Sequence, residues 1–450
     1  MDATPDREPT YPRPATAWWG VGLFTLGAVL SYTDRQILAF LVDPIRASLH
    51  ITDTQVSILQ GGAFAVLYSL IGLPLGRIAD LVPRRALLIL AIGLWSLGTA
   101  ACGFAHSFGA LFAARLLVGI GEAALAPAAI SLIGDYFPAQ RHATALGVFL
   151  TGIVIGAGAA IAVGGSLLQL AQTGLLHALP VLGILAPWRI VLVLAGLVGV
   201  AVGALMFTLH EPAGRRFSVR DLTARIAGLG GIIGTFRLHA RILGPLYAAM
   251  ALWSIVDYAI LSWTPALLMR RFGLSPGDVG ASLGLVAIVG GLVGTPLGGY
   301  ITDLVTARRG VGARFPLLFA VALAGTLGIP LGLMAGPTGA LASAGAWIFV
   351  SSAIGTISIA TVLDILPQEN RGLGTSTIAF NNTIIGLGLG PTLVALATDR
   401  LFQNPSALGF GMSTVIAPSV IGAISLYAVA MLRAGHASAC ARTIHEQHAS

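Results

Sequence analysis

The chain has 450 residues, of which 56% are hydrophobic and only 10% are charged. A soluble globular domain carries about 25% charged residues, so this composition excludes an ordinary soluble enzyme. It also excludes a disordered chain, which requires low hydrophobicity and high charge. The net charge is +7, but the charged residues are too few for a nucleic-acid-binding surface. The composition therefore indicates a polytopic α-helical membrane protein.

Apolar segments recur along the whole chain. A helix that crosses a bilayer needs about 20 predominantly apolar residues. The sequence predicts an all-α membrane protein of 12 transmembrane helices. These predicted spans lie near residues 17–41, 55–79, 86–105, 109–133, 143–170, 188–209, 242–269, 279–303, 314–335, 338–362, 373–399 and 409–433.

The arginines orient these spans, because every basic side chain in the sequence is an arginine. With both termini in the cytoplasm, 18 arginines lie on the cytoplasmic side, five lie on the opposite side, and two lie within spans. Cytoplasmic loops carry an excess of basic residues, so we expect both termini to be cytoplasmic. We expect a multi-pass protein of the bacterial inner membrane.

The longest polar stretch divides the spans into two sets of six. The expected parts are a cytoplasmic N-terminal tail (1–16), an N-terminal six-helix bundle (17–209), a cytoplasmic linker (210–241), a C-terminal six-helix bundle (242–433) and a cytoplasmic C-terminal tail (434–450).

The two sets of spans repeat each other in sequence. At an offset of 223 residues, Asp34 matches Asp257, and the Gly76–Asp80 segment matches the segment that ends at Asp303. At an offset of 229, Asp135 matches Asp364. Parallel six-helix repeats are typical of transporters with a pseudo-twofold axis and a binding site between the two halves.

The loop between the second and third spans, Gly76-Arg-Ile-Ala-Asp80-Leu-Val-Pro-Arg84-Arg85, resembles the signature loop of the major facilitator superfamily. The resemblance implies two six-helix bundles and a latch between the cytoplasmic helix ends in the outward-open state. A simple basic loop that fixes topology is the alternative. The expected latch residues are Gly76, Asp80, Arg84, Arg85, Asp303, Arg308 and Arg309.

Two further motifs resemble the Spinster family: Ser31-Tyr-Thr-Asp34-Arg35 in the first span, and Arg115-Leu-Leu-Val-Gly-Ile-Gly-Glu122-Ala in the fourth. Known Spinster proteins move lysolipids and sphingoid phosphates, some with proton coupling. The resemblance implies a proton-coupled secondary transporter of amphipathic, lipid-like substrates that works by alternating access. The alternatives are a carrier of small organic anions, a multidrug exporter, and a membrane receptor or sensor without flux.

Five charged side chains are predicted within spans: Asp34, Arg35, Arg115, Glu122 and Asp257. Each costs at least about 2.5 kcal/mol in lipid, so they are expected to face the interior and to pair. Helix geometry places Asp34 and Arg115 at one depth, with Glu122 ~10 Å deeper. We expect the carboxyls of Glu122 and Asp34 to compete for Arg115. Protonation of one then frees the guanidinium for the other, or for an anionic head group. A static buried ion cluster is the alternative.

The candidate substrate-binding residues include several of these charges. Asp257 is also a candidate for a second proton site, or for a hydrogen bond between helices. The aromatic and amide candidates serve equally well as interface anchors or interhelical contacts. The full set of candidate substrate-binding residues is Arg35, Arg115, Glu122, Asp257, Tyr32, Tyr68, Phe380 and Asn381.

The sequence contains no credible catalytic set, P-loop or metal motif, since His445-Glu-Gln-His448 is one residue short of the zinc spacing. We therefore expect a monomeric carrier, not an enzyme, without cofactor or metal. The fifth span is rich in glycine and resembles an antiporter motif, but Ala157 stands in place of its proline. Close packing of small residues explains those glycines equally well.

Overall fold

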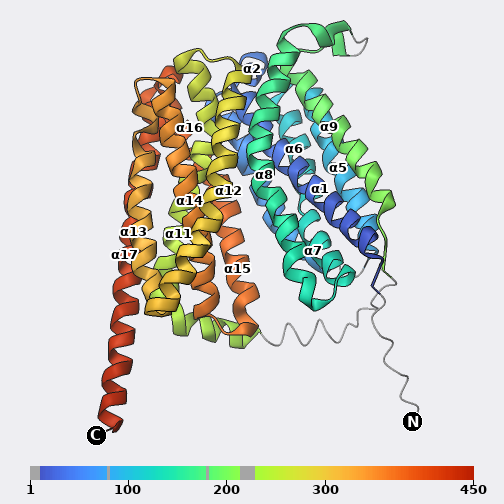
Figure 1. Ribbon diagram of the computed structural model, residues 1–450. Helices are drawn as coiled ribbons and strands as arrows, with labels where there is room; N and C mark the ends of the chain where they lie inside the picture. The colour runs from blue at the N-terminus through green and yellow to red at the C-terminus, as the bar shows by residue number, and fades with distance from the viewer. Residues whose placement is uncertain (1–10, 79–81, 179–181, 213–228, 450) are drawn as a thin grey trace, which may run out of the picture.

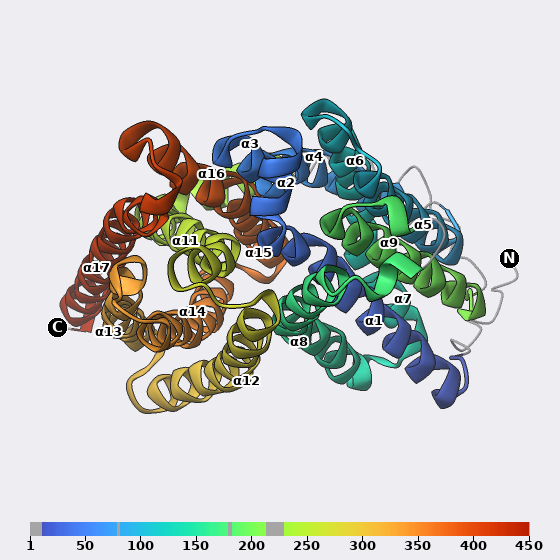
Figure 2. The same ribbon diagram turned by 90° about the horizontal axis from the view of Figure 1, so that it is seen from above.

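A computed structural model describes residues 11–78, 82–178, 182–212 and 229–449. The described residues are almost entirely helical and form two bundles that lie side by side, as Figure 1 and the view from above in Figure 2 show. We call residues 11–212 the N-half and residues 229–449 the C-half. The helices of the N-half are α1 (Pro14–Phe40), α2 (Val42–Leu49), α3 (Asp53–Ser57), the π-helical η1 (Ile58–Gly62), α4 (Ala63–Ile78), α5 (Arg84–Gly103), α6 (Phe108–Glu122), α7 (Leu125–Tyr136), α8 (Ala139–Gln172) and α9 (Pro187–Leu205).

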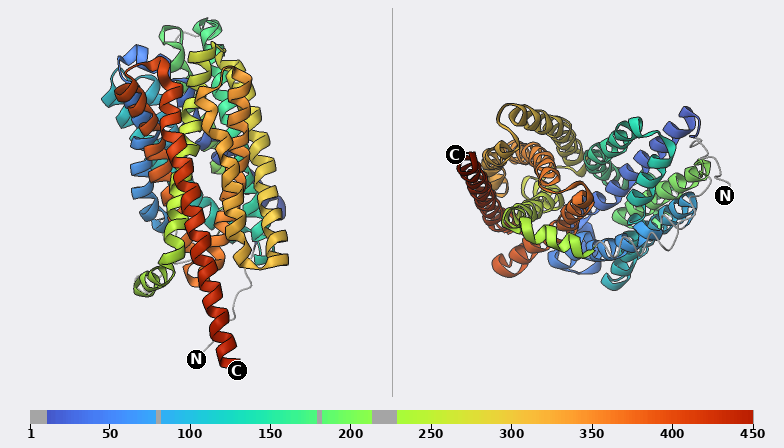
Figure 3. Two further views of the ribbon diagram at one scale, coloured as in Figure 1. Left: turned by 90° about the vertical axis from the view of Figure 1, so that its left-hand side faces the viewer. Right: turned by 90° about the horizontal axis from the view of Figure 1, so that it is seen from below.

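The C-half repeats this pattern with longer helices. Figure 3 shows α17 continuing past the bundle towards the C-terminus, so the segment predicted to be a tail prolongs this helix. The helices of the C-half are α11 (Leu229–Phe272), α12 (Pro276–Arg309), α13 (Arg314–Ala324), the 3₁₀-helical η6 (Gly325–Leu333), α14 (Pro337–Ile365), α15 (Arg371–Phe380), the π-helical η8 (Asn381–Leu387), α16 (Gly388–Leu396), the π-helical η9 (Ala397–Phe402) and α17 (Leu408–Ala449).

Eleven segments of the described chain are long and apolar enough to cross a membrane, and each corresponds to one of the twelve predicted spans. The remaining predicted span corresponds to α1, which has 27 residues and is long enough. Its mean hydropathy is lower because Asp34, Arg35 and Gln36 lie in its last turns. These are the residues from which the candidate site is built.

The predicted fourth span is divided into two helices. Helix α6 ends at Glu122 and α7 begins at Leu125. Pro127 has no N–H group to donate to the carbonyl of Ala123, four residues earlier, which weakens the helix where α6 gives way to α7. The interruption places Glu122 at the last residue of α6, in the middle of the molecule.

Helix α8 packs between α1 and α12, and its glycines make both contacts possible. A Cβ atom on Gly156 would meet the Cα atom of Val29 at 2.9 Å. A Cβ atom on Gly158, two residues further, would meet the carbonyl oxygen of Gly284 at 2.9 Å. The glycine-rich sequence of this span is therefore explained by close helix packing, one of whose contacts joins the two halves.

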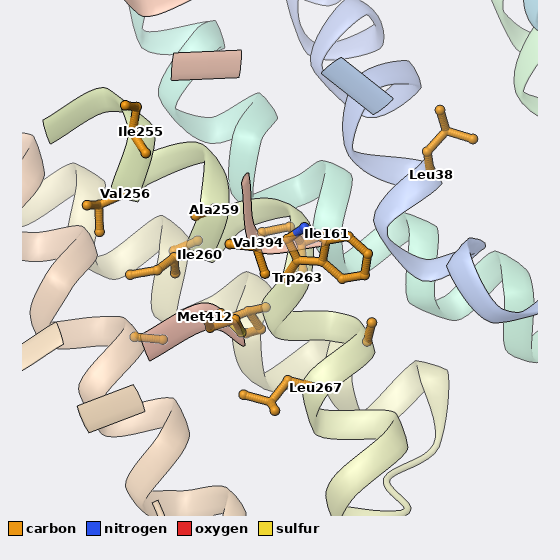
Figure 4. Packing of buried hydrophobic residues seen from close by; sticks show 14 of the residues in the cluster. Leu38, Ile161, Ile255, Val256, Ala259, Ile260, Trp263, Leu267, Val394 and Met412 are labelled. Atoms are coloured by element: carbon orange, nitrogen blue, oxygen red, sulfur yellow. The ribbon is translucent and has the colours of Figure 1, made fainter. Parts of the chain in front are cut away.

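The two halves are also joined by aromatic packing. Trp263 of α11 is fully buried and donates a hydrogen bond from Nε1 to the carbonyl oxygen of Pro391 at 2.9 Å. Figure 4 shows Trp263 among apolar side chains that include Ile161 of α8, Val394 of α16 and Met412 of α17. The main core thus runs from the C-half into the N-half.

Candidate transport site

A buried ion pair lies at the centre of the N-half. The Arg35 Nε atom is 2.7 Å from Glu122 Oε2, and the Glu122 side chain has no exposed surface. Ser31 Oγ donates to the same oxygen at 2.6 Å. Glu122 Oε1 is buried and has no hydrogen-bond partner in the described part of the chain. The carboxyl therefore has one fully occupied oxygen and one that is available to a proton or another donor.

Aromatic rings hold Arg35 in position. Its guanidinium carbon lies 4.4 Å from the ring centre of Phe64, 5.0 Å from that of Tyr68 and 5.3 Å from that of Tyr32. Desolvated cation–π contacts are worth about 2 kcal/mol, and here three rings surround a single cation. The rings fix the direction of the guanidinium while leaving its remaining N–H groups available. Tyr68, a predicted site residue, thus acts on the arginine.

Asp34 and Arg115 lie in the same buried region but do not form the predicted pair. Asp34 Oδ2 accepts a hydrogen bond from Thr99 Oγ1 at 3.2 Å, and Arg115 Nε donates to the carbonyl oxygen of Leu59 at 3.2 Å. Asp34 Oδ1 and Arg115 Nη2 are buried without a partner in the described residues. Their charges interact through space without a hydrogen bond between them.

The expectation that two carboxyls share Arg115 therefore has to be corrected, because Glu122 is paired with Arg35. The reason is helical geometry. Arg35 lies four residues after Ser31, so both side chains leave α1 on one face and reach the same carboxylate oxygen. Arg115 lies two turns from Glu122 along α6, about 10 Å away, and is drawn instead to the carbonyl oxygen of Leu59 in η1.

The C-half contributes Asp257, the sequence counterpart of Asp34. Asp257 Oδ1 accepts hydrogen bonds from Ser351 Oγ at 2.6 Å and from Trp347 Nε1 at 2.8 Å. Trp253 stacks on Trp347 with ring centres 4.5 Å apart, and its Nε1 donates to Ser351 at 3.0 Å. Unlike Glu122, this carboxyl is held by neutral donors.

A cavity of about 310 Å³ lies between the two halves, with Tyr32 and α8 on one side and α11, α12 and α14 on the other. Its wall is mostly apolar, and Asp257 is the acidic side chain that lines it. A second cavity of about 140 Å³, which we call the side cavity, extends into the C-half and also contains Asn381. Phe380 is 53% exposed and lines neither space.

Ion pairs join the halves at the end of the molecule that holds α2 and α3, at the top of Figure 1, which we call the α2 end. Arg270 of α11 pairs with Asp43 at 2.7 Å and with Asp53 at 2.8 Å. Asp399 of η9 accepts hydrogen bonds from the backbone N and the hydroxyl of Thr54, both at 2.7 Å. No local pattern in the sequence predicts these contacts of Arg270, because its partners lie more than 200 residues away in the chain.

Packing strengthens this junction. A Cβ atom on Gly61 of η1 would collide with the carbonyl oxygen of Leu387 in η8. Two π-helical segments, one from each half, therefore touch where Gly61 has no side chain. Such segments often occur at functional sites, because they alter the spacing of backbone groups.

The described latch residues lie at the other end, at which α1 begins and α17 ends and which we call the terminal end. Gly76 lies near the end of α4, and Asp80 lies outside the described residues. Arg84 pairs with Asp135 at 2.9 Å within the N-half. Glu211, which sequence reasoning missed, accepts hydrogen bonds from the backbone N–H groups of Arg84 at 3.1 Å and Arg85 at 2.6 Å.

The C-half contains a corresponding ion pair at a different position from the predicted one. Asp303, Arg308 and Arg309 are exposed, and no ion pair is seen for them in the described part of the chain. Arg314 instead pairs with Asp364. The structural counterpart of the Arg84–Asp135 pair is therefore Arg314–Asp364, because Arg314 begins α13 as Arg84 begins α5.

Residues 24–391 match the family model of the Major Facilitator Superfamily. The chain is 29% identical over 418 residues to an MFS-type efflux pump of Mycolicibacterium smegmatis, covering 91% of this chain and 92% of the relative. It is 24% identical to a hexuronate transporter of Bacillus subtilis, over 88% of this chain and 92% of the relative. It is 23% identical to the sphingosine-1-phosphate transporter SPNS2 of Xenopus tropicalis, over 93% of this chain and 81% of the relative.

Among solved structures, the fold is similar to that of a bacterial homologue of the human lysosomal transporter Spinster in an inward-facing, unoccupied conformation. The TM-score is 0.79 at 24% identity, covering 94% of this chain and 98% of that chain. The all-helical, two-bundle architecture and the matched family model agree with each other. The chain is an integral membrane transporter that belongs to the Major Facilitator Superfamily and resembles its Spinster members.

Proposed function

We propose that this transporter carries amphipathic, lipid-like anions of the lysophospholipid or sphingoid-phosphate type, coupled to protons, by alternating access. The observation that carries the proposal is the buried Arg35–Glu122 pair beside an apolar cavity between the halves. A ligand site of this kind combines a large apolar wall with a few placed polar groups. The relative that is named a sphingosine-1-phosphate transporter supports the same substrate class.

The head group is assigned to Arg35 and the apolar body to the main cavity. Tyr32 and Tyr258 line both the main cavity and a small space beside Arg35, Gln36 and Gln60. An anionic head group that passes these two rings would reach the guanidinium, whose planar fork suits a phosphate or carboxylate. Arg115 lies two turns before Glu122 on α6 and contributes positive charge without direct contact with the head group in this conformation.

Proton coupling follows from competition for one cation. Glu122 as a carboxylate occupies Arg35, and an anionic substrate needs the same guanidinium. A proton on Glu122 removes the competing charge, so proton and anion binding favour each other. Asp34 is a second carboxyl, close enough to interact electrostatically with Glu122 and Arg35. We assign it as the group that shares the proton with Glu122.

Alternating access is assigned to the two ends of the molecule. The Arg270 ion pairs and the Gly61–Leu387 contact would hold the α2 end closed while the terminal end is open. In the opposite state, the latch residues Asp80, Arg84 and Arg85 would hold the terminal end. The arginine distribution supports a cytoplasmic position for both termini in a bacterial inner membrane. We further propose a monomer that acts as a carrier and not as an enzyme.

Two other substrate classes remain alternatives with specific support. The hexuronate transporter favours a small organic anion, and the efflux pump favours a drug-like compound. The apolar lining of the main cavity argues against a sugar acid, which would need many more hydrogen-bond partners.

The test uses purified protein in liposomes that contain a pH-sensitive dye. Lysophospholipids, sphingoid phosphates, hexuronates and cationic drugs are added in turn, with Glu122→Gln and Arg35→Ala in parallel. We expect a proton flux triggered by the lipid anions, lost in Arg35→Ala and reduced in Glu122→Gln. A flux triggered only by hexuronates or drugs would replace the proposed substrate. Labelled lysolipid that crosses without proton movement would contradict the coupling.

A further inference from the structure

We propose that Asp257 is a second proton-binding site, located in the C-half, that exchanges its proton through the side cavity. This inference extends the proposed function, in which protons and substrate move together. The site is separate from the Arg35–Glu122 pair and uses different elements of the fold. Its ligand is a proton carried by water, and the substrate occupies the main cavity.

The two carboxylate oxygens of Asp257 differ in their hydrogen bonds. Oδ1 is occupied by two neutral donors, Ser351 and Trp347. No described group donates a hydrogen bond to Oδ2. Asp257 lines both the main cavity and the side cavity, so a proton can reach Oδ2 from an open space. Protonation on Oδ2 leaves both existing hydrogen bonds intact, and the only change is from a carboxylate to a neutral carboxyl.

The surroundings of Asp257 contain no described cation that would pair with it. The titratable groups that face it are phenols: Tyr258 on its own helix, Tyr427 on α17, and Tyr32 on α1 across the main cavity. Helix α14 offers tryptophan and serine, η8 offers amides, and α8 and α12 offer mostly apolar side chains. An unpaired carboxylate inside a membrane protein is costly, so this group needs a proton in at least one state.

The side cavity has room for water and polar groups to bind it. Its wall is mostly apolar, like that of the main cavity, but hydroxyl and amide side chains line part of it, and its volume of about 140 Å³ exceeds the ~30 Å³ of one water molecule several-fold. Ser358 and the Tyr427 hydroxyl lie 3.3 Å apart along its wall. Its polar lining residues are Ser254, Ser351, Ser358, Asn381, Asn382 and Tyr427.

The direction of the side cavity separates the proton route from the substrate route. Ser351 and Ile359 lie eight residues apart on α14, about 12 Å along the helix axis, with Ile359 nearer the terminal end. The side cavity therefore extends from Asp257 towards the terminal end, and the proposed proton route runs through it. The main cavity, between the halves, stays available to the substrate.

The first measurement needs no substrate. Infrared difference spectra of the full-length protein, recorded as the pH is changed, report carboxyl groups that gain a proton. We expect one protonated-carboxyl band to be missing in Asp257→Asn and to remain in Glu122→Gln. The asparagine keeps an oxygen to accept from Ser351 and Trp347 but binds no proton. A spectrum of Asp257→Asn that equals the wild type would overturn the proposal, whether or not the proposed substrates are correct.

The second measurement compares proton flux with substrate exchange in liposomes. We expect Asp257→Asn to lower the number of protons moved per substrate by about half, and an unchanged ratio would contradict the proposal. Ser351→Ala is the matched control, because it removes a hydrogen-bond donor and leaves the carboxyl. Loss of exchange in Asp257→Asn, with Asp257→Glu also inactive, would contradict the proposal and make Asp257 a substrate or packing residue.

Discussion

The two halves repeat the same helices but carry different chemistry. The N-half concentrates Asp34, Arg35, Arg115 and Glu122 around one buried ion pair, whereas the C-half contributes one acidic side chain, Asp257, to the two cavities, where neutral donors hold it. The scaffold charges behave differently, since Arg84–Asp135 and Arg314–Asp364 form the same pair in both halves. The two ion pairs that the repeat preserves hold helices together, whereas Arg35, Arg115 and Glu122 have no charged counterpart in the C-half and belong to the site.

The largest effect that would sharpen this contrast is expected for Arg35→Ala. Removing one partner of a buried ion pair costs about 3–5 kcal/mol, and here it also removes the proposed head-group ligand. We expect anionic amphiphile binding to fall by about 100-fold or more. Binding is measured with labelled lysolipid on purified protein. The double variant Arg35→Ala/Glu122→Gln removes both charges, and it should fold normally while still failing to bind.

A smaller effect is expected at the α2 end, where Arg270 joins the halves. Arg270→Gln leaves Asp43 and Asp53 without their partner from the C-half. Truncating one member of a partly buried charge pair costs about 2 kcal/mol or more, so this end should open more often. Spin labels or dyes placed across the α2 end should show a longer mean distance. An unchanged distance distribution would mean that packing alone, as at Gly61, closes this end.

The repeated pair at the terminal end is expected to affect stability more than substrate affinity. Arg84→Gln removes the contact with Asp135, and Asp364→Asn removes the matching contact with Arg314. Such partly exposed pairs contribute about 1 kcal/mol each, so both variants should lower the melting temperature slightly and similarly. Substrate affinity should stay within about twofold of the wild type. A large loss of affinity in only one of them would break the proposed distinction.

Much of the fold could be predicted from composition, hydropathy and the internal repeat. Eleven predicted spans were confirmed, and the family was confirmed by the match over residues 24–391. The division of the fourth span at Glu122 was not predicted, since Pro127 within an apolar run reads as tolerable in a membrane helix. The C-half pair was misplaced because Arg308 and Arg309 resemble Arg84 and Arg85 in sequence, whereas Arg314 begins the corresponding helix.

Within the candidate site, the sequence identified the charged residues but not their partners. The position of each residue along its helix places Asp34 and Arg115 at the same depth in the membrane. That depth does not determine the direction in which a long side chain points. The aromatic rings around Arg35 and the carbonyl oxygen of Leu59 decide those directions, and they come from α4 and η1. The ion pairs of Arg270 depend on segments more than 200 residues apart in the chain, for which no local pattern exists.

The most direct test of the account is the affinity for an anionic amphiphile as a function of pH. A lysolipid with a phosphodiester head group is suitable, because its own charge stays constant. As the pH falls, a proton on Glu122 should free Arg35, so wild-type affinity should rise, while Glu122→Gln should bind tightly with most of that dependence lost. An affinity that depends on pH equally in Glu122→Gln and in the wild type would contradict the claim that the Glu122 carboxylate and the anionic substrate compete for Arg35.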